Sequence, residues 1–190
     1  IQMYNNFRSS SIPIPMSFVG YATKAVLILE FSPTIISVVL AGKVGSYITS
    51  SIGTMRVTEQ IDALDIMGVN SANLLILPKI LASLVFNPLL IAISIVFGIW
   101  GGYLAGIGTG SWSAADYITG IQMYMPSHFI WYAFFKTAVF AFLIATIPAY
   151  FGYNVKGGSL EVGRASTQAV VWTIVAVIIT NLVLTQMFLS

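Results

Sequence analysis

The chain has 190 residues, of which 57% are hydrophobic and 7% are charged, and its mean hydropathy is +0.91. A soluble domain carries about 25% charged residues, so this chain has too little charge to cover a water-exposed surface, and we predict an integral membrane protein. Its net charge of +2 is too small for a nucleic-acid-binding protein, and its lack of cysteine excludes disulfides, thiolate metal sites and cysteine catalysis.

Four segments are long and apolar enough to cross a bilayer, which takes about 20 residues. The first is interrupted by charges and by Pro33, so we expect a short helix up to about Leu29 and then a span over 31–51. The others are residues 80–115, with a kink at Pro88, then 129–153 and 165–190. Residues 1–7 would end a fifth span. The chain starts at Ile1, not Met, so we expect it to lack its natural N-terminus.

The expected fold is therefore all-α: a polytopic helical bundle forming one transmembrane domain over 1–190. It has about four complete transmembrane helices plus the end of a fifth. The connections 53–79 and 154–164 contain Lys or Arg, whereas 108–128 contains neither. By the positive-inside rule, the first two are cytoplasmic and 108–128 is a periplasmic loop. Within that loop, Asp116 is expected to cap or solvate a helix over about 113–123.

Charge gathers on the segment RVTEQIDALDIMGVN, residues 56–70. Four of the 14 charged residues lie there, three of them acids. Thr58 is a candidate N-cap, and Gly68 stands where a left-handed C-cap belongs. We therefore predict a short amphipathic helix over 58–68 in a cytoplasmic connection.

The chemistry of this helix favours a protein partner. Ile61, Leu64 and Met67 form an apolar stripe, and Glu59 and Asp62 lie in the first turn. Helices that lie on a membrane surface are usually rich in Lys and Arg, whereas this one is acidic. Docking into a groove on a cytoplasmic partner is favoured over the alternative that the helix lies on the membrane surface.

These residues also resemble a known family, the MlaE/YrbE-type permeases, over essentially all 190 residues. The stretch EFSPTIISVVLAGKVGSYITSSIGTMRVTEQIDALDIMGVN carries the closest resemblance, supported by GIWGG at 98–102 and GRAST at 163–167. The matching positions are Glu30, Pro33, Ala41, Gly42, Gly45, Ser46, Gly53, Met55, Arg56, Thr58, Glu59 and Gln60. Three positions depart from the family pattern: Leu29 where some members have Arg, Ser32 for Gly and Lys43 for Arg. A role of that Arg in holding a lipid head group cannot be transferred to Leu29.

The resemblance implies the membrane permease subunit of an ABC transporter that moves phospholipid between the two membranes of an envelope. It implies an inner-membrane location in a double-membrane bacterium. The implied partners are an ABC ATPase subunit, a second copy of the chain and a periplasmic MCE-domain protein, with a small STAS-like regulatory subunit as a further candidate. The helix over 58–68 then becomes the coupling helix to the ATPase, with candidate residues Thr58, Glu59, Gln60, Ile61, Asp62, Leu64, Asp65 and Met67.

Two charges inside spans are candidates for a lipid pocket, Glu30 and Lys136. An ionised group at membrane depth is costly unless it is paired or hydrated, so it usually faces a cavity or a partner. A polar cavity that holds a phospholipid head group is one interpretation for both. The alternatives are a structural ion pair, or a Lys136 that reaches back to the interface.

Small residues at four-residue spacing predict close helix packing rather than lipid contact. They are Ala41, Gly45, Gly98, Gly102 and Gly106. Which helices they bring together is not readable from the sequence.

No catalytic or metal-binding pattern is found. The single histidine, His128, is a poor basis for a metal site or a triad, and no Walker A motif occurs. The chain is predicted to be non-catalytic and to bind no cofactor, with ATP and Mg on a partner subunit. Two other functions remain open: a non-transporting scaffold that recruits a cytoplasmic protein, or an ion-coupled secondary transporter with Glu30 as the coupling acid.

Overall fold

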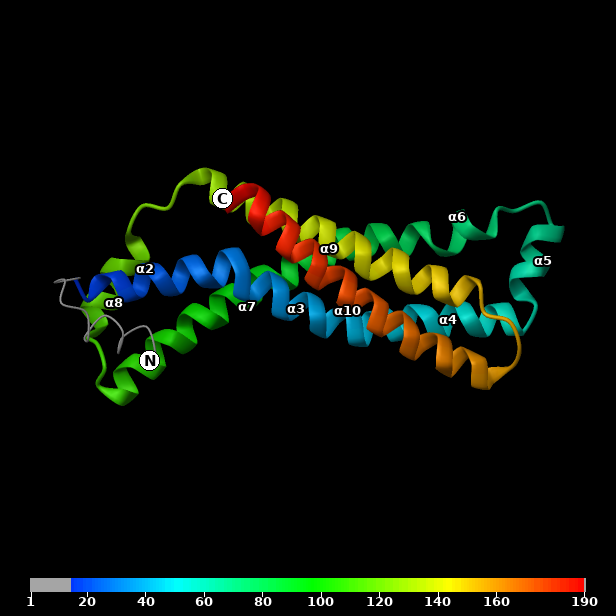
Figure 1. Cartoon of the computed structure of the whole chain (residues 1–190), viewed down its shortest axis with the longest axis horizontal. Helices are drawn as coiled ribbons and strands as arrows, with labels where there is room; N and C mark the ends of the chain where they lie inside the picture. The colour runs from blue at the N-terminus through cyan, green and yellow to red at the C-terminus, as the bar shows by residue number, and fades with distance from the viewer. Residues whose placement is uncertain (1–14, 190) are drawn as a thin grey trace. The chain divides into compact units, whose positions relative to one another are not determined.

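A computed structural model describes residues 15–189 of the chain, with side chains as far as Phe188. The described residues are helical, joined by short connections (Figure 1). The expected end of a fifth span, residues 1–7, lies outside the described residues. The elements are α2 (Ser17–Val26), η1 (Leu27–Phe31), α3 (Ser32–Leu40), η2 (Ala41–Gly45), α4 (Ser46–Val57), α5 (Gln60–Ile66), α6 (Ser71–Leu75), α7 (Leu77–Thr109), α8 (Ala114–Gln122), α9 (Ser127–Tyr153) and α10 (Ser159–Leu189).

Four helical stretches are long and apolar enough to cross a membrane, which confirms the all-α polytopic fold and its four spans. They comprise Ser17–Val57, Ser71–Thr109, Ser127–Tyr153 and Ser159–Phe188. The chain is thus a multi-pass membrane protein.

The predicted break at Pro33 is wrong. The first stretch runs as one helix through Pro33 because the turn before the proline, η1, is π-helical. There the Ser32 N–H donates to the Leu27 carbonyl, five residues back. A proline ring clashes with the carbonyl four residues before it, and the wider π turn relieves that crowding without ending the helix.

Contacts divide the chain into two compact units. Unit 1 contains residues up to Pro33 together with Ile91–Ala133, and unit 2 contains Thr34–Leu90 with Phe134–Ser190. Each unit is described separately below.

In unit 1, α2 and α8 cross in close contact at two glycines. A Cβ on Gly20 would collide with the backbone of α8, and one on Gly120 would collide with the backbone of α2. Lys24 of α2 donates to the carbonyls of Ile121 and Met123, at 2.8 and 2.7 Å, so its charge lies at the negative C-terminal end of α8.

The start of α8 is capped near Asp116, but the N-cap residue is Ser113 and not Asp116 itself. The Asp116 N–H donates to Ser113 Oγ at 3.1 Å, and the Ser113 hydroxyl donates to the Asp116 carboxylate at 2.7 Å. Tyr117, one residue further on, is buried, and its hydroxyl donates to the Ile99 carbonyl at 3.1 Å. Burial raises the pKa of this phenol, and a hydrogen bond with Thr23 acts in the opposite direction.

In unit 2, α4 packs against α9 and α10. Thr49 Oγ1 donates to the Pro148 carbonyl at 2.9 Å, which joins α4 to α9. Ser83 of α7 donates to the Ala141 carbonyl at 3.0 Å, which joins α7 to the same helix. A hydrophobic core forms beside these contacts, from Ile48, Ile52, Ile61, Ala145 and Ala149.

Candidate coupling segment

The charged connection between α4 and α7 forms a helix shorter than expected. It runs over Gln60–Ile66, and Thr58 does not cap it, so that prediction is wrong. Thr58 instead ends α4, where its hydroxyl donates to the Thr54 carbonyl at 2.8 Å. The residue before α5 is Glu59, with a left-handed φ of 60° and no side-chain cap. A non-glycine residue seldom adopts this conformation, which here reverses the chain between α4 and α5.

The other end of α5 has the expected glycine cap. Gly68 has a φ of +76°, and its N–H donates to the Asp65 carbonyl at 3.0 Å. The Val69 N–H donates to the Leu64 carbonyl at 3.1 Å, which completes a Schellman motif. The backbone of α5 is therefore fixed at its C-terminal end by its own sequence.

The predicted apolar stripe does not face outward as one surface. Ile61 has no exposed area and lies in the core of unit 2, against α4 and α9. Leu64 is half-buried, whereas Met67 is 68% exposed. Ile61 thus anchors the segment to its own helices, because burying its side chain there is worth about 2 kcal/mol.

A chain of polar contacts holds α5 from a second side. Arg56, in the last turn of α4, forms a 2.6 Å ion pair with Asp62 of α5. The Arg56 guanidinium also lies 5.8 Å from the centre of the Tyr153 ring, at the end of α9. The Tyr153 hydroxyl hydrogen-bonds with the Ser71 hydroxyl of α6 at 2.9 Å. Four helices therefore meet around Arg56. Asp62 lies only six residues from Arg56 along the chain. The Tyr153 ring was not predictable from the sequence, because it comes from a helix far from Arg56 along the chain.

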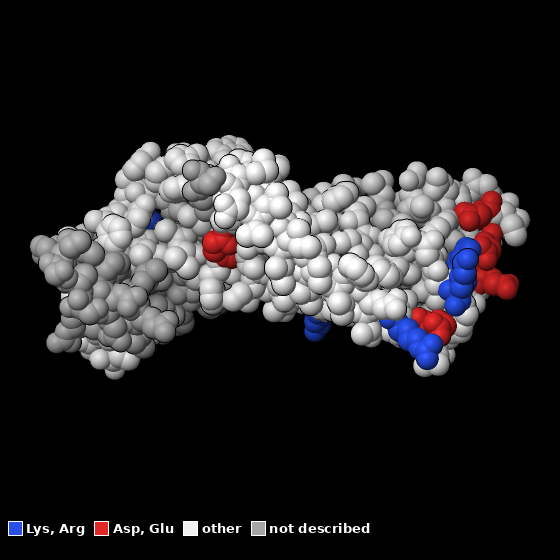
Figure 2. All heavy atoms as spheres, viewed as in Figure 1, with Lys and Arg blue, Asp and Glu red and all other residues white. Residues whose placement is uncertain are grey.

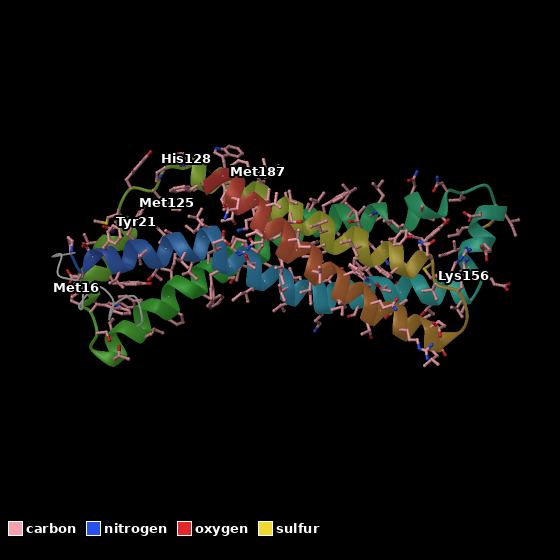
Figure 3. All side chains as sticks on the ribbon, viewed as in Figure 1. Met16, Tyr21, Met125, His128, Lys156 and Met187 are labelled. Carbon is pink, nitrogen blue, oxygen red and sulfur yellow. The ribbon has the colours of Figure 1, made fainter. Side chains whose placement is uncertain are left out.

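The outer surface of α5 carries acids and exposed apolar groups. Glu59, Asp62 and Asp65 are exposed, and Ile66 is 87% exposed. Figure 2 shows acidic and basic side chains side by side at this end of unit 2. The α9–α10 connection, with Lys156 in its middle (Figure 3), lies at the same end. An exposed isoleucine among carboxylates suits a protein partner better than an anionic lipid surface.

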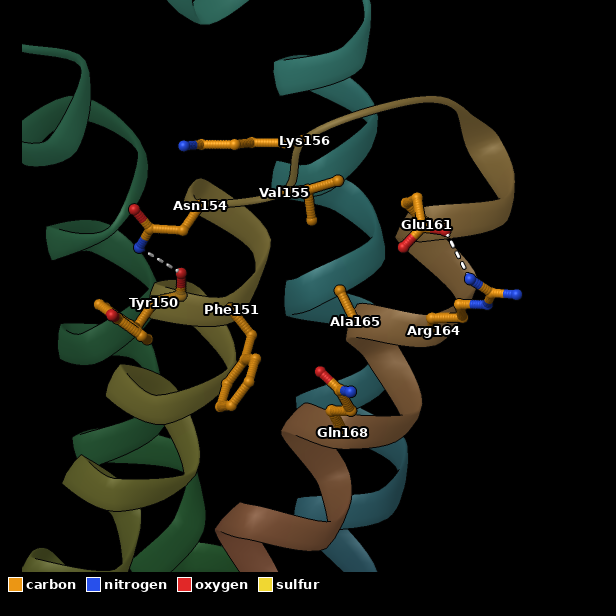
Figure 4. Close-up of a pocket in the computed structure, with 9 residues that line it drawn as sticks. All are labelled: Tyr150, Phe151, Asn154, Val155, Lys156, Glu161, Arg164, Ala165 and Gln168. Carbon is orange, nitrogen blue, oxygen red and sulfur yellow. Dashed lines mark hydrogen bonds and ion pairs between the residues drawn. The ribbon is translucent and has the colours of Figure 1, made fainter.

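A cavity of about 410 Å³ opens between the end of α9 and the start of α10. Figure 4 shows Phe151 and Gln168 pointing toward the space between the two helices. Arg164 pairs with Glu161 at 2.8 Å beside it. No motif in the sequence indicates this cavity. Its lining is Tyr150, Phe151, Asn154, Val155, Lys156, Glu161, Arg164, Ala165 and Gln168.

The two intramembrane charges lie in different surroundings. Lys136, in unit 2, has no exposed area, and its Nζ is 3.5 Å from Thr185 Oγ1 and 6.0 Å from the centre of the Phe140 ring. Complete burial contradicts the alternative that this lysine reaches the membrane interface. Glu30, in unit 1, is half-buried in the π-helical turn η1.

The predicted packing residues are buried or lie against side chains of other segments. Ala41 is fully buried, and a Cβ on Gly45 would come within 3.2 Å of the Pro148 ring. In unit 1, a Cβ on Gly98 would come within 2.9 Å of Leu27. Larger side chains at Gly102 and Gly106 would collide with Tyr117 and Trp112, respectively.

The lone histidine, His128, is at the start of α9 (Figure 3), and its ring contacts Phe129 edge to face with centroids 4.4 Å apart. Across residues 15–189, no three His, Asp or Glu side chains are grouped to hold a metal ion.

The chain has four membrane-spanning helical stretches, and three of them hold the short helix α5 at one end. These features define a multi-pass helical membrane protein. The chain belongs to the MlaE permease family, whose model matches residues 1–187.

Individual relatives agree with this family. The chain is 38% identical over 169 residues to a "Probable ABC transporter permease protein" of Rickettsia bellii, covering 88% of this chain and 65% of that relative. It is 33% identical over 166 residues to the chloroplastic protein TRIGALACTOSYLDIACYLGLYCEROL 1 of Arabidopsis thaliana, covering 84% and 45%. It is 30% identical over 160 residues to the "Intermembrane phospholipid transport system permease protein MlaE" of Haemophilus influenzae, covering 84% and 61%. The chain thus spans less than two thirds of the length of each of these three relatives.

Proposed function

We propose that this chain forms the membrane part of an ATP-driven transporter that moves phospholipid between the inner and outer membranes of a double-membrane bacterium. A separate ABC ATPase subunit binds ATP and Mg and hydrolyses the ATP, so the chain itself is not an enzyme. The names of the Rickettsia and Haemophilus relatives support this assignment. The observation that carries it is the fastening of α5 to the spans by Ile61 and by the Arg56–Asp62 pair.

This fastening makes α5 suitable for transmitting force. Leu75, Ile76 and Ile80, from α6 and the start of α7, pack against the core that contains Ile61. A movement of α5 would therefore displace α4, α7 and α9 together, because packed cores shift as units and do not deform continuously. Its exposed acids and Ile66 remain available to the ATPase.

The other parts of the proposal concern lipid and partners. A second copy of the chain completes the transport path. Glu30 contacts the phospholipid, and Lys136, which is buried in this conformation, contacts it once the helices around it move apart. A periplasmic MCE-domain protein exchanges lipid with the permease, and a small STAS-like subunit is a regulatory candidate. Residues 58–68 and 154–164 face the cytoplasm, and 108–128 faces the periplasm.

The test is co-purification of the full-length protein with its ATPase, comparing wild type with the double variant Asp65→Lys plus Ile66→Glu. Both side chains are exposed, so the fold should survive. The control is Tyr124→Glu, a residue 81% exposed in the connection between α8 and α9. We expect the double variant to lose the ATPase while the control retains it, and both to elute as folded protein.

Retention of a fully active ATPase by the double variant would refute α5 as the docking element. Lipid transfer between vesicles, measured with an ATPase-dead partner, separates the remaining functions. We expect transfer to stop. Transfer that persists without ATP would indicate an ion-coupled transporter, and no transfer under any condition would indicate a scaffold.

A further inference from the structure

A groove of about 270 Å³ lies in unit 2 between the first span and α7, beside the core that contains Ile48. Its walls are mainly apolar, contributed by Leu40, Val44, Tyr47, Ala82, Phe86 and Leu90. Tyr47 and Phe86 are 71% and 62% exposed, so the groove opens on the outside of the unit. Neither Glu30 nor Lys136 lines it.

A cation stands at one end of this groove. Lys79, in the first turn of α7, lines it and donates to Ser51 Oγ of α4 at 3.3 Å. The hydrogen bond keeps the ammonium group beside the groove and directs it toward α4. Among the described residues that line the groove, Lys79 carries the charge.

The length of the groove matches one leaflet of a bilayer. Lys79 and Leu90 are 11 residues apart on α7, a rise of about 16 Å at about 1.5 Å per residue. The hydrocarbon core of a bilayer is about 30 Å thick, so one leaflet accounts for about half of it. A cation at one end and an apolar wall one leaflet long are complementary to a lipid with an anionic head group.

We propose that this groove binds an anionic phospholipid from the leaflet on the α5 side. The phosphate lies at Lys79, and an acyl chain lies along Ala82, Phe86 and Leu90. This is a lipid site on the outer surface of the spans. It does not depend on ATP-driven transport, and its occupant stabilises the junction between α4 and α7.

The experiment uses full-length protein in detergent and phosphatidylglycerol with a photoactivatable group on its acyl chain. Labelled peptides are read by mass spectrometry. We expect label on 40–48 and 82–90. Lys79→Gln should lower this labelling about fivefold, because a lysine near an anionic lipid contributes about 1 kcal/mol. Ala82→Leu should also lower it by filling the groove, since Ala82 is exposed within it.

Two matched substitutions control for charge and volume. Lys43→Gln removes a cation of the first span that is exposed and does not line the groove. Ala92→Leu adds the same volume at an exposed position of α7 outside the groove. Both should label like wild type, and inorganic phosphate at millimolar concentration should not compete.

Three results would overturn the proposal. Labelling that is unchanged in both Lys79→Gln and Ala82→Leu would mean that the groove does not hold the probe. Equal labelling by a phosphatidylcholine probe, with or without Lys79, would mean that lipid contact there is non-specific. Competition by inorganic phosphate alone would mean a free-anion site and not a lipid site.

Discussion

Arg56, at the end of α4, forms a 2.6 Å ion pair with Asp62 in the first turn of α5, across the chain reversal at Glu59. The two side chains are 34% and 52% exposed, so solvent screens the pair and its contribution to stability is at most about 1 kcal/mol. Its importance is geometric, because it fixes the direction in which α5 leaves α4.

Breaking this pair should uncouple α5 without unfolding the protein. We predict that Arg56→Glu lowers the transition temperature only slightly but reduces ATPase activity in the complex, and that adding Asp62→Arg restores part of that activity. The matched control is the Arg164–Glu161 pair, at 2.8 Å within α10, whose reversal should leave the ATPase unchanged. Equal effects of the two charge reversals would contradict a special role for Arg56.

Ile61 should be the residue of α5 on which the stability of unit 2 depends most. Ile61→Ala leaves a cavity in the core and should destabilise the protein by about 2–4 kcal/mol. Ile66→Ala, at a position 87% exposed, should change stability by less than about 0.5 kcal/mol. Thermal unfolding in detergent measures both. Similar shifts for the two variants would mean that Ile61 is not anchored in the core.

The crossing of α2 and α8 should tolerate no side chain at either glycine. Gly120→Ala places a Cβ against the backbone of α2, which cannot rotate away as a side chain could. We predict a clear loss of folded protein. Gly101→Ala is the control, because a Cβ there meets nothing within 4 Å, and it should stabilise α7 by about 0.5–1 kcal/mol. Size-exclusion chromatography and thermal unfolding report the difference.

Lys136→Met tests whether the buried cation contacts lipid. Methionine keeps most of the volume and removes the charge, so the variant should fold and carry about tenfold less co-purifying phospholipid, as expected for the loss of one charged hydrogen bond. Mass spectrometry of extracted lipid measures the change. Unchanged lipid with a lower transition temperature would assign Lys136 to structure alone.

Asn87 is a position where a substitution is expected to keep or raise stability, and not to lower it. It is 4% exposed, and among the described residues no acceptor lies within hydrogen-bonding distance of its amide nitrogen. Asn87→Leu removes this uncompensated polar group at similar volume and should leave stability unchanged or raise it. Asn87→Asp would bury a charge there and should lower the transition temperature strongly. If Asn87→Leu destabilises as much as Asn87→Asp, the amide has an essential partner.

Several features followed from the sequence alone. Low charge and long apolar runs fixed the membrane class and four spans, because a helix must satisfy its own backbone inside lipid. The Gly68 cap and a capped helix start near Asp116 were also predictable, since both depend on neighbours a few residues away. The failures at Pro33 and Thr58 were local as well. At Pro33, a π-helical turn before the proline lets the helix continue. At Thr58, the left-handed conformation of Glu59 reverses the chain, so α5 begins after Glu59 without a cap from Thr58.

Tertiary structure decided which face of each helix is covered. The sequence assigned Ile61 to an outward stripe with Met67, but α4 and α9 enclose Ile61 and leave Met67 exposed. The same holds for the contact of Arg56 with Tyr153 and for the groove at Lys79, which joins residues about 40 positions apart in the chain. Periodicity shows that a helix has two faces. Which face is buried depends on contacts between segments distant in the sequence, and in a chain this apolar every face offers similar side chains, so those contacts cannot be inferred from the residues themselves.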